Sequence, residues 1–256
     1  MVSPSFLKDA TLVMPAGGKG ERIAALAEAK HVNKAVLKVG GLSLIGRTLG
    51  MYARAGVKRV VVLVFHRARS VEEELGNGSR FGVSIRYSMD PKHPIGKGGA
   101  IRLAIERGHI PVDKPMIIHN PDDQVVGIDA RFPKLIMGRH RAAERRGCVA
   151  SAVCVPWTQY AYSAFKVRRG KAVSAVMYPK VFFPTHIGVT VFSAGVAGMF
   201  RKLIDLKKKV DFESVVLPRL ASRGKLGVTT IPTGAWISVN DLKGYLKLLT
   251  ALGIKH

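Results

Sequence analysis

The residue pattern with the clearest chemical potential is a glycine-rich turn near the start of the chain. It reads Pro15-Ala16-Gly17-Gly18-Lys19-Gly20-Glu21-Arg22. Three glycines in four positions let backbone N–H groups approach a ligand without interference from Cβ atoms, and loops of this kind bind phosphate. Lys19 and Arg22 add positive charge at the same place. The spacing is neither that of a Walker A loop nor that of the dinucleotide-binding G-x-G-x-x-G pattern, so a tight turn without a ligand is the alternative.

This turn belongs to an alternation of short apolar runs and helix-length segments. We expect strands at residues 11–16, 59–65, 84–87 and 115–119, separated by helices at 44–55, 71–75 and 99–108. The run at 59–65 is β-branched and continuously apolar, as in a strand that is buried on both faces. The β-α-β-α-β-α-β order predicts a parallel sheet with right-handed crossovers.

The second half of the chain is more mixed. Its expected elements are a basic helix at 132–146, a strand at 148–155, a hairpin at 164–176 that turns at Arg169-Gly170, a strand at 188–192, helices at 200–208 and 214–223, strands at 227–231 and 236–239, and a helix at 242–252. No segment has the composition of a linker, and no internal repeat is visible. We therefore predict a single α/β domain over residues 1–256, with a Rossmann-like, mixed but mainly parallel central sheet flanked by helices.

The composition points to an anionic partner. The 256 residues include 41 Lys and Arg against 17 Asp and Glu, so the formal net charge is +24. Such an excess predicts a nucleic acid, an acidic membrane face or a phosphate-rich small ligand as partner, and charge alone does not choose among them. Hydrophobic residues at 47% exclude a disordered chain, and only 2 cysteines exclude a disulfide scaffold.

Neither a targeting signal nor a membrane span is visible. The longest apolar stretches run for about six residues, whereas a span needs about 20. The first residues lack the apolar run of a secretory signal. Cys148 and Cys154 fit two buried free thiols. These features favour a cytoplasmic protein without a membrane partner.

Five motifs in order resemble the nucleotidyltransferases that make nucleoside-diphosphate sugars. Similar openings occur in the molybdopterin and cobinamide-phosphate guanylyltransferase branches. The motifs are the glycine-rich turn with Asn33-Lys34-Ala35-Val36-Leu37-Lys38-Val39-Gly40-Gly41, then Pro94-Ile95-Gly96-Lys97-Gly98-Gly99-Ala100, Asn120-Pro121-Asp122-Asp123, the strand at 188–193, and Asp211-Phe212-Glu213 with Val216-Leu217-Pro218. The match covers roughly residues 11–250. It implies a nucleotide-diphospho-sugar transferase-like fold.

The resemblance also implies a reaction. A sugar 1-phosphate would attack the α-phosphate of an NTP, and pyrophosphate would leave. Arg22 would contact the β- and γ-phosphates, Lys34 would bridge to the α-phosphate or the incoming phosphate, and Asp122 would bind Mg²⁺. Asp123 is the adjacent alternative for the metal, and a turn or cap without a ligand is the structural alternative for both carboxylates.

Nucleotide contacts are implied at several further positions. The backbone of the first turn would bind phosphate at Ala16, Gly17, Gly18, Lys19 and Gly20. Gly98 and Gly99 would allow close approach of the base or sugar, or else simply begin a helix. Asp90 stands where the family often places a glutamine, and a carboxylate could accept hydrogen bonds from guanine. GTP is therefore the candidate donor.

Two departures from the family pattern leave alternatives open. The usual Trp-x-Asp segment reads Trp236-Ile237-Ser238, so Asn240 or Asp241 would complete the metal site, or the second ligand would be absent. The usual Glu-Lys-Pro motif is missing. Lys180 and Gly188 are implied on the substrate side, but the acceptor need not be a common hexose phosphate.

Three functions follow in order of preference. The first is an Mg²⁺-dependent nucleotidyltransferase that acts on an NTP and a phosphorylated, sugar-like acceptor. The second is a non-catalytic nucleotide-binding regulator of the same fold. The third is a nucleic-acid-binding protein, motivated by basic runs at 139–146, 166–171 and 201–209 that fit solvated faces better. The pattern leaves the oligomeric state open.

Overall fold

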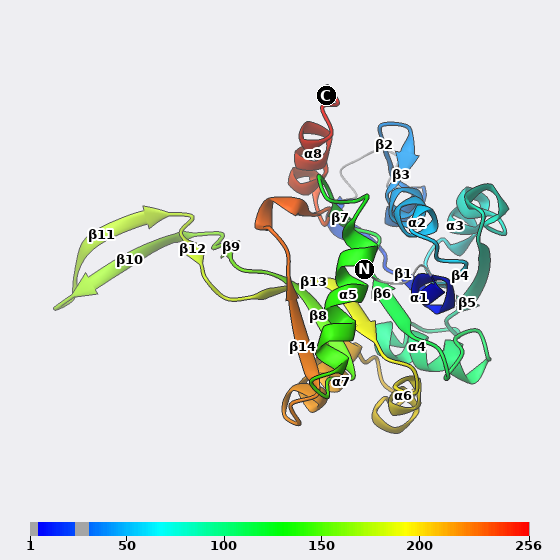
Figure 1. Ribbon diagram of the computed structural model, residues 1–256. Coiled ribbons are helices and arrows are strands. Elements are labelled where there is room, and N and C mark those ends of the chain that lie inside the picture. The colour runs from blue at the N-terminus through cyan, green and yellow to red at the C-terminus, as the bar shows by residue number, and fades with distance from the viewer. Residues whose placement is uncertain (1–4, 24–30, 256) are drawn as a thin grey trace.

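A seven-stranded mixed sheet with helices on both faces forms the body of the protein (Figure 1). The computed structural model describes residues 5–23 and 31–255. The sheet strands, in chain order, are β1 (Thr11–Ala16), β4 (Arg59–Val64), β5 (Ser84–Met89), β6 (Met116–His119), β8 (Ala150–Val155), β13 (Thr185–Phe192) and β14 (Leu226–Thr230). Their order across the sheet is β14-β8-β13-β6-β1-β4-β5.

Strand direction confirms the predicted mixed sheet. β1 pairs in parallel with β4 and β6, β4 with β5, and β8 with β14. β13 runs antiparallel to both of its neighbours, β6 and β8. The parallel first half thus matches the expectation from its β-α-β order, and the second half adds the one reversed strand of this sheet. The carboxyl ends of β1 and β6 consequently lie at the same edge, where ligands collect in open α/β sheets.

Helices cover the two faces of the sheet, and the buried hydrophobic side chains form one cluster on each face and a third cluster beside the last helix. The helices are α1 (Ser5–Asp9), α2 (Leu44–Arg54), α3 (Ala68–Leu75), α4 (Gly96–Glu106), α5 (Phe132–Glu144), α6 (Ala197–Leu203), α7 (Phe212–Ala221) and α8 (Leu242–Ala251). Because side chains alternate along a strand, Leu12 and Met14 enter the core under α1, α2, α3 and α5, whereas Val13 enters the core under α4, α6 and α7. No helix within the described ranges is both long and apolar enough to cross a bilayer.

Short 3₁₀ turns and two-stranded pairs lie outside the seven-stranded sheet. They are the 3₁₀ turns η1 (Glu21–Ile23), η3 (Lys34–Val36), η4 (Ser79–Phe81) and η5 (Thr233–Ala235), and the strand pairs β2 (Lys38–Val39) with β3 (Leu42–Ser43), β7 (Asp123–Val125) with β15 (Trp236–Ser238), β9 (Thr158–Gln159) with β12 (Lys180–Val181), and β10 (Ser163–Arg168) with β11 (Lys171–Met177). The hairpin expected at 164–176 is therefore confirmed as β10 and β11. The strand expected at 236–239 is β15, whereas its pairing with β7 is not predicted by the sequence, because pairing of such short strands depends on tertiary contacts.

A fully buried histidine links the end of β6 to α2. The Nε2 atom of His119 lies 2.7 Å from the backbone oxygen of Asp123, and its Nδ1 atom lies 3.0 Å from the hydroxyl of Tyr52. A carbonyl oxygen can only accept, so Nε2 carries the proton and Nδ1 accepts from the tyrosine. Both side chains are 0% exposed. The pair fixes the turn that follows β6 against the helix behind it.

Burial makes this histidine sensitive to acid. Loss of solvation lowers the pKa of His119 from 6.5 to about 4. Between these values the unfolded chain binds a proton that the folded chain does not, so the free energy of unfolding falls as the pH drops from 6.5 toward 4. We expect His119 to contribute about 3 kcal/mol to this loss. Urea unfolding across the pH range, with an NMR titration of the imidazole, measures it.

A matched control is His31→Gln, which removes an exposed histidine. Because this side chain is exposed, His31→Gln should lower stability little, whereas His119→Gln should flatten the pH dependence of stability and lower stability at neutral pH. Parallel stability curves for His119→Gln and the wild type, or an imidazole that titrates near 6.5, would contradict the assignment.

Candidate active site

The glycine-rich turn leaves the carboxyl end of β1 and enters η1. Gly20 has a φ of +68°, a left-handed conformation that favours glycine, and a Cβ atom there would lie 3.0 Å from the Cβ of Lys34. The backbone N–H of Ile23 donates to the oxygen of Gly20 at 3.1 Å, which begins the 3₁₀ turn. A glycine at this position thus lets the turn pass close to Lys34.

A cleft of about 510 Å³ opens beside this turn. Its lining includes Gly17, Gly18, Lys19, Arg22, Phe65, Asp90, Gly96, Lys97, Lys209 and Asp211. Four of the lining side chains are basic and two are acidic, so the cleft favours an anionic ligand. Of the predicted turn residues, Gly17, Gly18 and Lys19 lie with Arg22 and Asp90 around one space that is large enough for a small ligand. The predicted contact of Gly20 with a nucleotide stays a prediction.

A second, smaller cavity of about 100 Å³ adjoins the first, since Pro15 and Gly18 line both. It is also lined by Ala16, Asn33, Lys34, Ala35, Pro121 and Asp122. The end of β1 and its glycine turn thus form the boundary between the cleft with Arg22 and the cavity with Lys34 and Asp122. The predicted catalytic residues therefore lie around two neighbouring spaces, Arg22 at the larger and Lys34 and Asp122 at the smaller.

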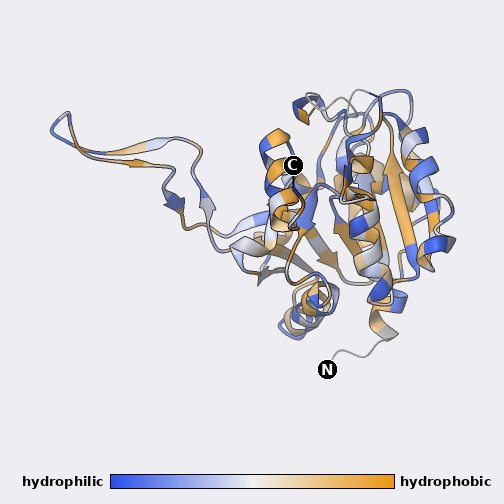
Figure 2. Cartoon of the chain, turned by 90° about the horizontal axis from the view of Figure 1, so that it is seen from above, coloured by the Kyte–Doolittle hydropathy of each residue, from blue (hydrophilic) through white to orange (hydrophobic). Residues whose placement is uncertain are grey.

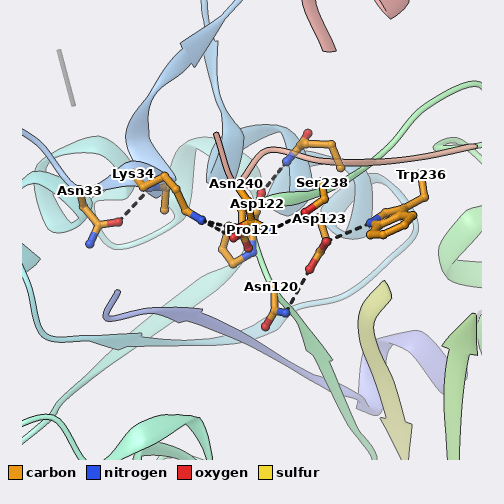
Figure 3. A network of polar contacts seen from close by, with 11 residues as sticks. Asn33, Lys34, Asn120, Pro121, Asp122, Asp123, Trp236, Ser238 and Asn240 are labelled. Atoms are coloured by element: carbon orange, nitrogen blue, oxygen red, sulfur yellow. Dashed lines mark hydrogen bonds and ion pairs between the residues drawn. The ribbon is translucent and has the colours of Figure 1, made fainter. Parts of the chain in front are cut away.

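The ammonium group of Lys34 joins three distant parts of the chain (Figure 3). It forms an ion pair with the carboxylate of Asp122 and donates a hydrogen bond of 3.0 Å to the side-chain oxygen of Asn240. The side chains of Lys34 and Asp122 are only 17% and 21% exposed. Asn240 is itself held by a 2.6 Å hydrogen bond from its Nδ2 to the hydroxyl of Ser238. The arrangement brings together three residues that the sequence proposed separately.

Asn33 places Lys34 at this point. Its side-chain oxygen accepts from the backbone N–H of Ala35 at 2.9 Å and so caps η3. Its Nδ2 donates to the backbone oxygens of Ala16 at 2.8 Å and His66 at 2.7 Å, at the ends of β1 and β4. The buried amide therefore fixes the start of η3 to two strands. The sequence signal for this role is an asparagine directly before a short helical turn, a common capping residue.

The two adjacent carboxylates after β6 have different surroundings. Asp122 faces Lys34, whereas Asp123 is buried and accepts hydrogen bonds from the Nδ2 of Asn120 at 3.1 Å and the Nε1 of Trp236 at 2.9 Å. Burial, with a smaller contribution from the neighbouring charge of Asp122, raises the pKa of Asp123 to about 7. Asp122 is consequently the accessible carboxylate, and Asp123 connects the turn to β15.

Gly188 permits this buried arrangement. Its φ is +71°, and a Cβ atom there would lie 2.1 Å from the Oδ2 of Asp123 and 2.3 Å from the Nδ2 of Asn120. The backbone N–H of Asn120 donates to the oxygen of Gly188 at 3.1 Å. The observed contacts of Gly188 are thus with the turn after β6, and its predicted contact with a substrate stays a prediction.

Gly98 and Gly99 face protein. Their backbone N–H groups donate to the oxygen of Val210, at 2.9 Å and 3.4 Å. A Cβ atom on Gly98 would lie 2.9 Å from that oxygen, and one on Gly99 would lie 2.8 Å from the Cβ of Ile95. Close packing at the start of α4 therefore explains both glycines, which is the structural alternative stated above. Gly96, Lys97 and Ala100 of the same segment line the cleft instead.

Two other predicted residues have different surroundings again. The carboxylate of Asp241 caps α8 by accepting from the backbone N–H of Gly244 at 2.8 Å. Of the two candidates for a second metal ligand, Asn240 is thus the one that the structure brings to Lys34. Lys180 lies on β12, with its ammonium 4.4 Å from the centre of the Trp157 ring. Its predicted role toward a substrate phosphate stays a prediction.

The oxygen atoms of Asp122 and Asn240 suit a magnesium ion. Both contact one cation, the Lys34 ammonium, so their oxygens converge on a single positive charge. Carboxylate and amide oxygens are hard ligands, and Mg²⁺ takes few protein ligands and completes its shell with water and phosphate oxygens. Within the described ranges no group of three or more His, Cys, Asp or Glu side chains could hold a metal ion. A site made with the substrate phosphates fits these residues.

Related proteins share parts of this sequence. Ninety residues are 36% identical to N-acetylmuramate alpha-1-phosphate uridylyltransferase of Neisseria meningitidis, over 35% of this chain and 38% of that protein. Eighty-nine residues are 34% identical to mannose-1-phosphate guanylyltransferase of Mycobacterium tuberculosis, over 35% of this chain and 24% of that protein. The aligned segments therefore span well under half of these relatives.

A solved structure and a family model match almost the whole length of this chain. A crystal structure assigned as a glucose-1-phosphate thymidylyltransferase from Bacillus anthracis, in complex with sucrose, superposes with a TM-score of 0.69, covering 96% of this chain and 97% of that chain. At 16% identity this likeness shows the fold alone. The family model described as nucleotidyl transferase matches residues 11–253. Because that match covers almost the entire sequence and includes every element of the site described above, the chain belongs to the nucleotidyl transferase family.

Proposed function

We propose that the protein transfers a nucleotidyl group from an NTP to a phosphorylated acceptor, most simply a sugar 1-phosphate. The observation that carries the proposal is the pair of adjoining spaces around the glycine turn, one with Arg22 and the other with Lys34 and Asp122. The names of the two relatives describe transferases that act on sugar 1-phosphates, which supports this class of acceptor.

The proposed reaction needs alignment and charge neutralisation rather than covalent help from the protein. A phosphate oxygen of the acceptor attacks the α-phosphorus of the NTP, the bond from that phosphorus to the bridging oxygen breaks, and pyrophosphate leaves. Two anions must approach each other, so positive groups at fixed positions lower the barrier most. Backbone N–H groups of Gly17 and Gly18 and the side chains of Lys19 and Arg22 would bind the β- and γ-phosphates.

Lys34 would act at the reacting phosphate. It lies beside Gly20, close to the end of the phosphate-binding turn. Asp122 and Asn240 fix the position of its ammonium group, and a ligand can still reach it because 17% of the side-chain surface is exposed. Asp122 and Asn240 would bind Mg²⁺, which when present neutralises charge on phosphate oxygens. Lys34 would then donate to an oxygen of the α-phosphate or of the acceptor.

Removing either charged group should abolish turnover while the fold persists. We expect Lys34→Met and Asp122→Asn each to lower kcat/KM by at least about 100-fold, a typical loss when one preorganised electrostatic contact is removed from a reacting group. The assay is pyrophosphate release from NTPs with a panel of sugar 1-phosphates and Mg²⁺. Chelation of the metal should stop the reaction, and added Mg²⁺ should restore it.

Matched controls are Lys58→Met and Asp129→Asn, which change an exposed lysine bonded to the Gly82 oxygen and an aspartate half-exposed beside Arg54. Both should retain wild-type rates. Near-normal turnover in Lys34→Met and Asp122→Asn would contradict the assigned roles. Tight NTP binding without turnover on any acceptor would instead favour the non-catalytic regulator.

The floor of the cleft suggests which base is read. Asp90 follows β5 and lines the cleft, and its carboxylate accepts a long hydrogen bond of 3.4 Å from the backbone N–H of Ile95. Asp90 is half-buried, and this burial raises the pKa of its carboxyl group. A carboxylate in such a place can accept from both N1–H and N2–H of guanine, a pair of donors that uracil, thymine and adenine do not present together.

GTP should accordingly be the preferred donor. We expect its kcat/KM to exceed that of UTP by at least about 10-fold, and Asp90→Asn to remove this preference, since a site that pairs polar groups with one substrate discriminates through the groups left unpaired by another. Rates with the four NTPs and dTTP, for the wild type and the variant, test it. A wild-type preference for UTP or dTTP would show that Asp90 does not read guanine.

A further inference from the structure

The feature that the proposed function does not use is a long arm between β8 and β13. We define the arm as residues 158–183, which contain β9, β10, β11 and β12. Figures 1 and 2 show it extending away from the body, with β10 and β11 at its outer end. Apart from half-buried Ala164, every residue of β10 and β11 is exposed. The outer part of the arm therefore makes little contact with the rest of the chain.

The arm holds most of the exposed apolar surface. Of the fifteen large hydrophobic side chains that are exposed in the described parts of the chain, ten lie between residues 160 and 183. Exposed apolar residues are normal when scattered, but a contiguous group marks an interaction site. A two-stranded ribbon is also marginally stable in water on its own, because it has no layer against which to bury a face. The arm thus has the properties of a segment that packs against something.

One face of the hairpin is apolar. Phe165 lies opposite Ala175 in the register and Val167 opposite Ala172, and Met177 lies two residues from Ala175 along β11. Because residues two apart on a strand share a face and opposed residues point to the same side, the side chains of Phe165, Val167, Ala172, Ala175 and Met177 lie on one side of the ribbon. Val173 is the extra residue at the bulge, where the register shifts between Lys166 and Val167. Phe165, Val167 and Met177 are 61%, 63% and 68% exposed.

The opposite face carries the charge. Lys166 and Arg168 alternate with Phe165 and Val167 along β10, and Lys171 pairs with Arg168. These three cations therefore lie away from the apolar face. The sequence has no acidic residue from position 145 to position 204, so nothing in the arm neutralises them. The hairpin is amphipathic, with one uncharged side and one cationic side.

This segregation favours a second copy of the chain as the partner. Two hairpins that stack through their apolar faces place Lys166, Arg168 and Lys171 of each copy on the outside, separated by two layers of strands about 10 Å apart, a distance comparable to the screening length of salt. An anionic bilayer is a poorer fit, since inserting the apolar face would aim Lys166, Arg168 and Lys171 away from the lipid phosphates. An RNA would contact the cations but leave the apolar face in water.

The available area is sufficient for such a pair. Three aromatic residues, Phe165, Phe182 and Phe183, are exposed by 61%, 72% and 74%. If Phe182 and Phe183, which follow β12 outside the hairpin, also enter the contact, they and the large side chains of the apolar hairpin face together offer roughly 700 Å² per protomer. That area is close to the ~800 Å² that each partner buries in an interface of standard size. A self-complementary patch of this kind suits a two-fold symmetric contact, the most common arrangement of soluble oligomers.

We propose that the arm is a dimerisation element, in which the apolar face of one hairpin packs on the same face of a second copy around a two-fold axis. The body of each protomer, with its cleft, then lies outside the contact. The inference is independent of the proposed reaction, because it depends only on residues 158–183 and not on Lys34, Asp122 or Asp90.

Light scattering during gel filtration and sedimentation velocity, over a 100-fold range of protein concentration, test the proposal. The wild type should be a dimer at micromolar concentration. The triple variant Phe165→Ser, Val167→Ser, Met177→Ser should be monomeric, with a dissociation constant raised at least about 100-fold, because every substitution acts twice in a symmetric contact. Its circular dichroism and its GTP binding should match those of the wild type, which shows that the body is folded.

The matched control changes the other face. Lys166→Gln, Arg168→Gln, Lys171→Gln alters three residues of the same ribbon and should leave the dimer intact or tighten it. A monomeric wild type at every concentration would overturn the proposal, as would a triple serine variant that dimerises like the wild type. Monomers that sediment with phosphatidylglycerol vesicles or bind a single-stranded oligonucleotide, and lose this in either variant, would assign the arm to that ligand and equally overturn the dimer.

Discussion

A single ammonium group, that of Lys34, connects the parts of this structure that matter for chemistry. The lysine belongs to a 3₁₀ turn after the glycine loop, Asp122 follows the central strand β6, and Asn240 lies almost at the end of the chain. Within a half-buried space these groups attract each other more strongly than they would in water. Their convergence requires that β1 and β6 be neighbours and that β15 pair with β7, which is the observed topology. The order and pairing of the strands therefore determine the geometry of the site.

The sequence predicted the architecture well because its first half is strongly patterned. The buried parallel strand β4 is a continuous run of mostly β-branched residues, and helices follow both β4 and β5, so the order of elements leaves little freedom. The same reasoning located the strands of the second half and the hairpin. It did not find β7 or the short helix α1, since neither segment is a distinct apolar run or long enough to show helical periodicity.

Within the site, spacing identified which segments converge but not which neighbouring side chain points inward. Asp122 and Asp123 are adjacent residues of the same type. Asp122 nevertheless faces Lys34, whereas Asp123 is buried between Asn120 and Trp236. The choice is made by β7, which starts at Asp123 and turns that side chain toward β15. Asn240 and Asp241 differ for a similar reason, because the start of α8 takes Asp241 as its cap. Such choices depend on tertiary pairing, and one sequence does not contain them.

The route of the chain around the arm has a consequence for folding kinetics. Thr185 pairs with Val155, so the arm leaves and re-enters the sheet at adjacent points, and β8 must find β13 across the whole excursion. Closing a long flexible loop is slow and entropically costly, but a hairpin that forms locally within microseconds shortens the effective loop. The turn at Arg169-Gly170, with both residues in the left-handed region, starts that hairpin. Early formation of β10 and β11 would thus shorten the loop between β8 and β13 and speed their antiparallel pairing, on which the second half of the sheet is built.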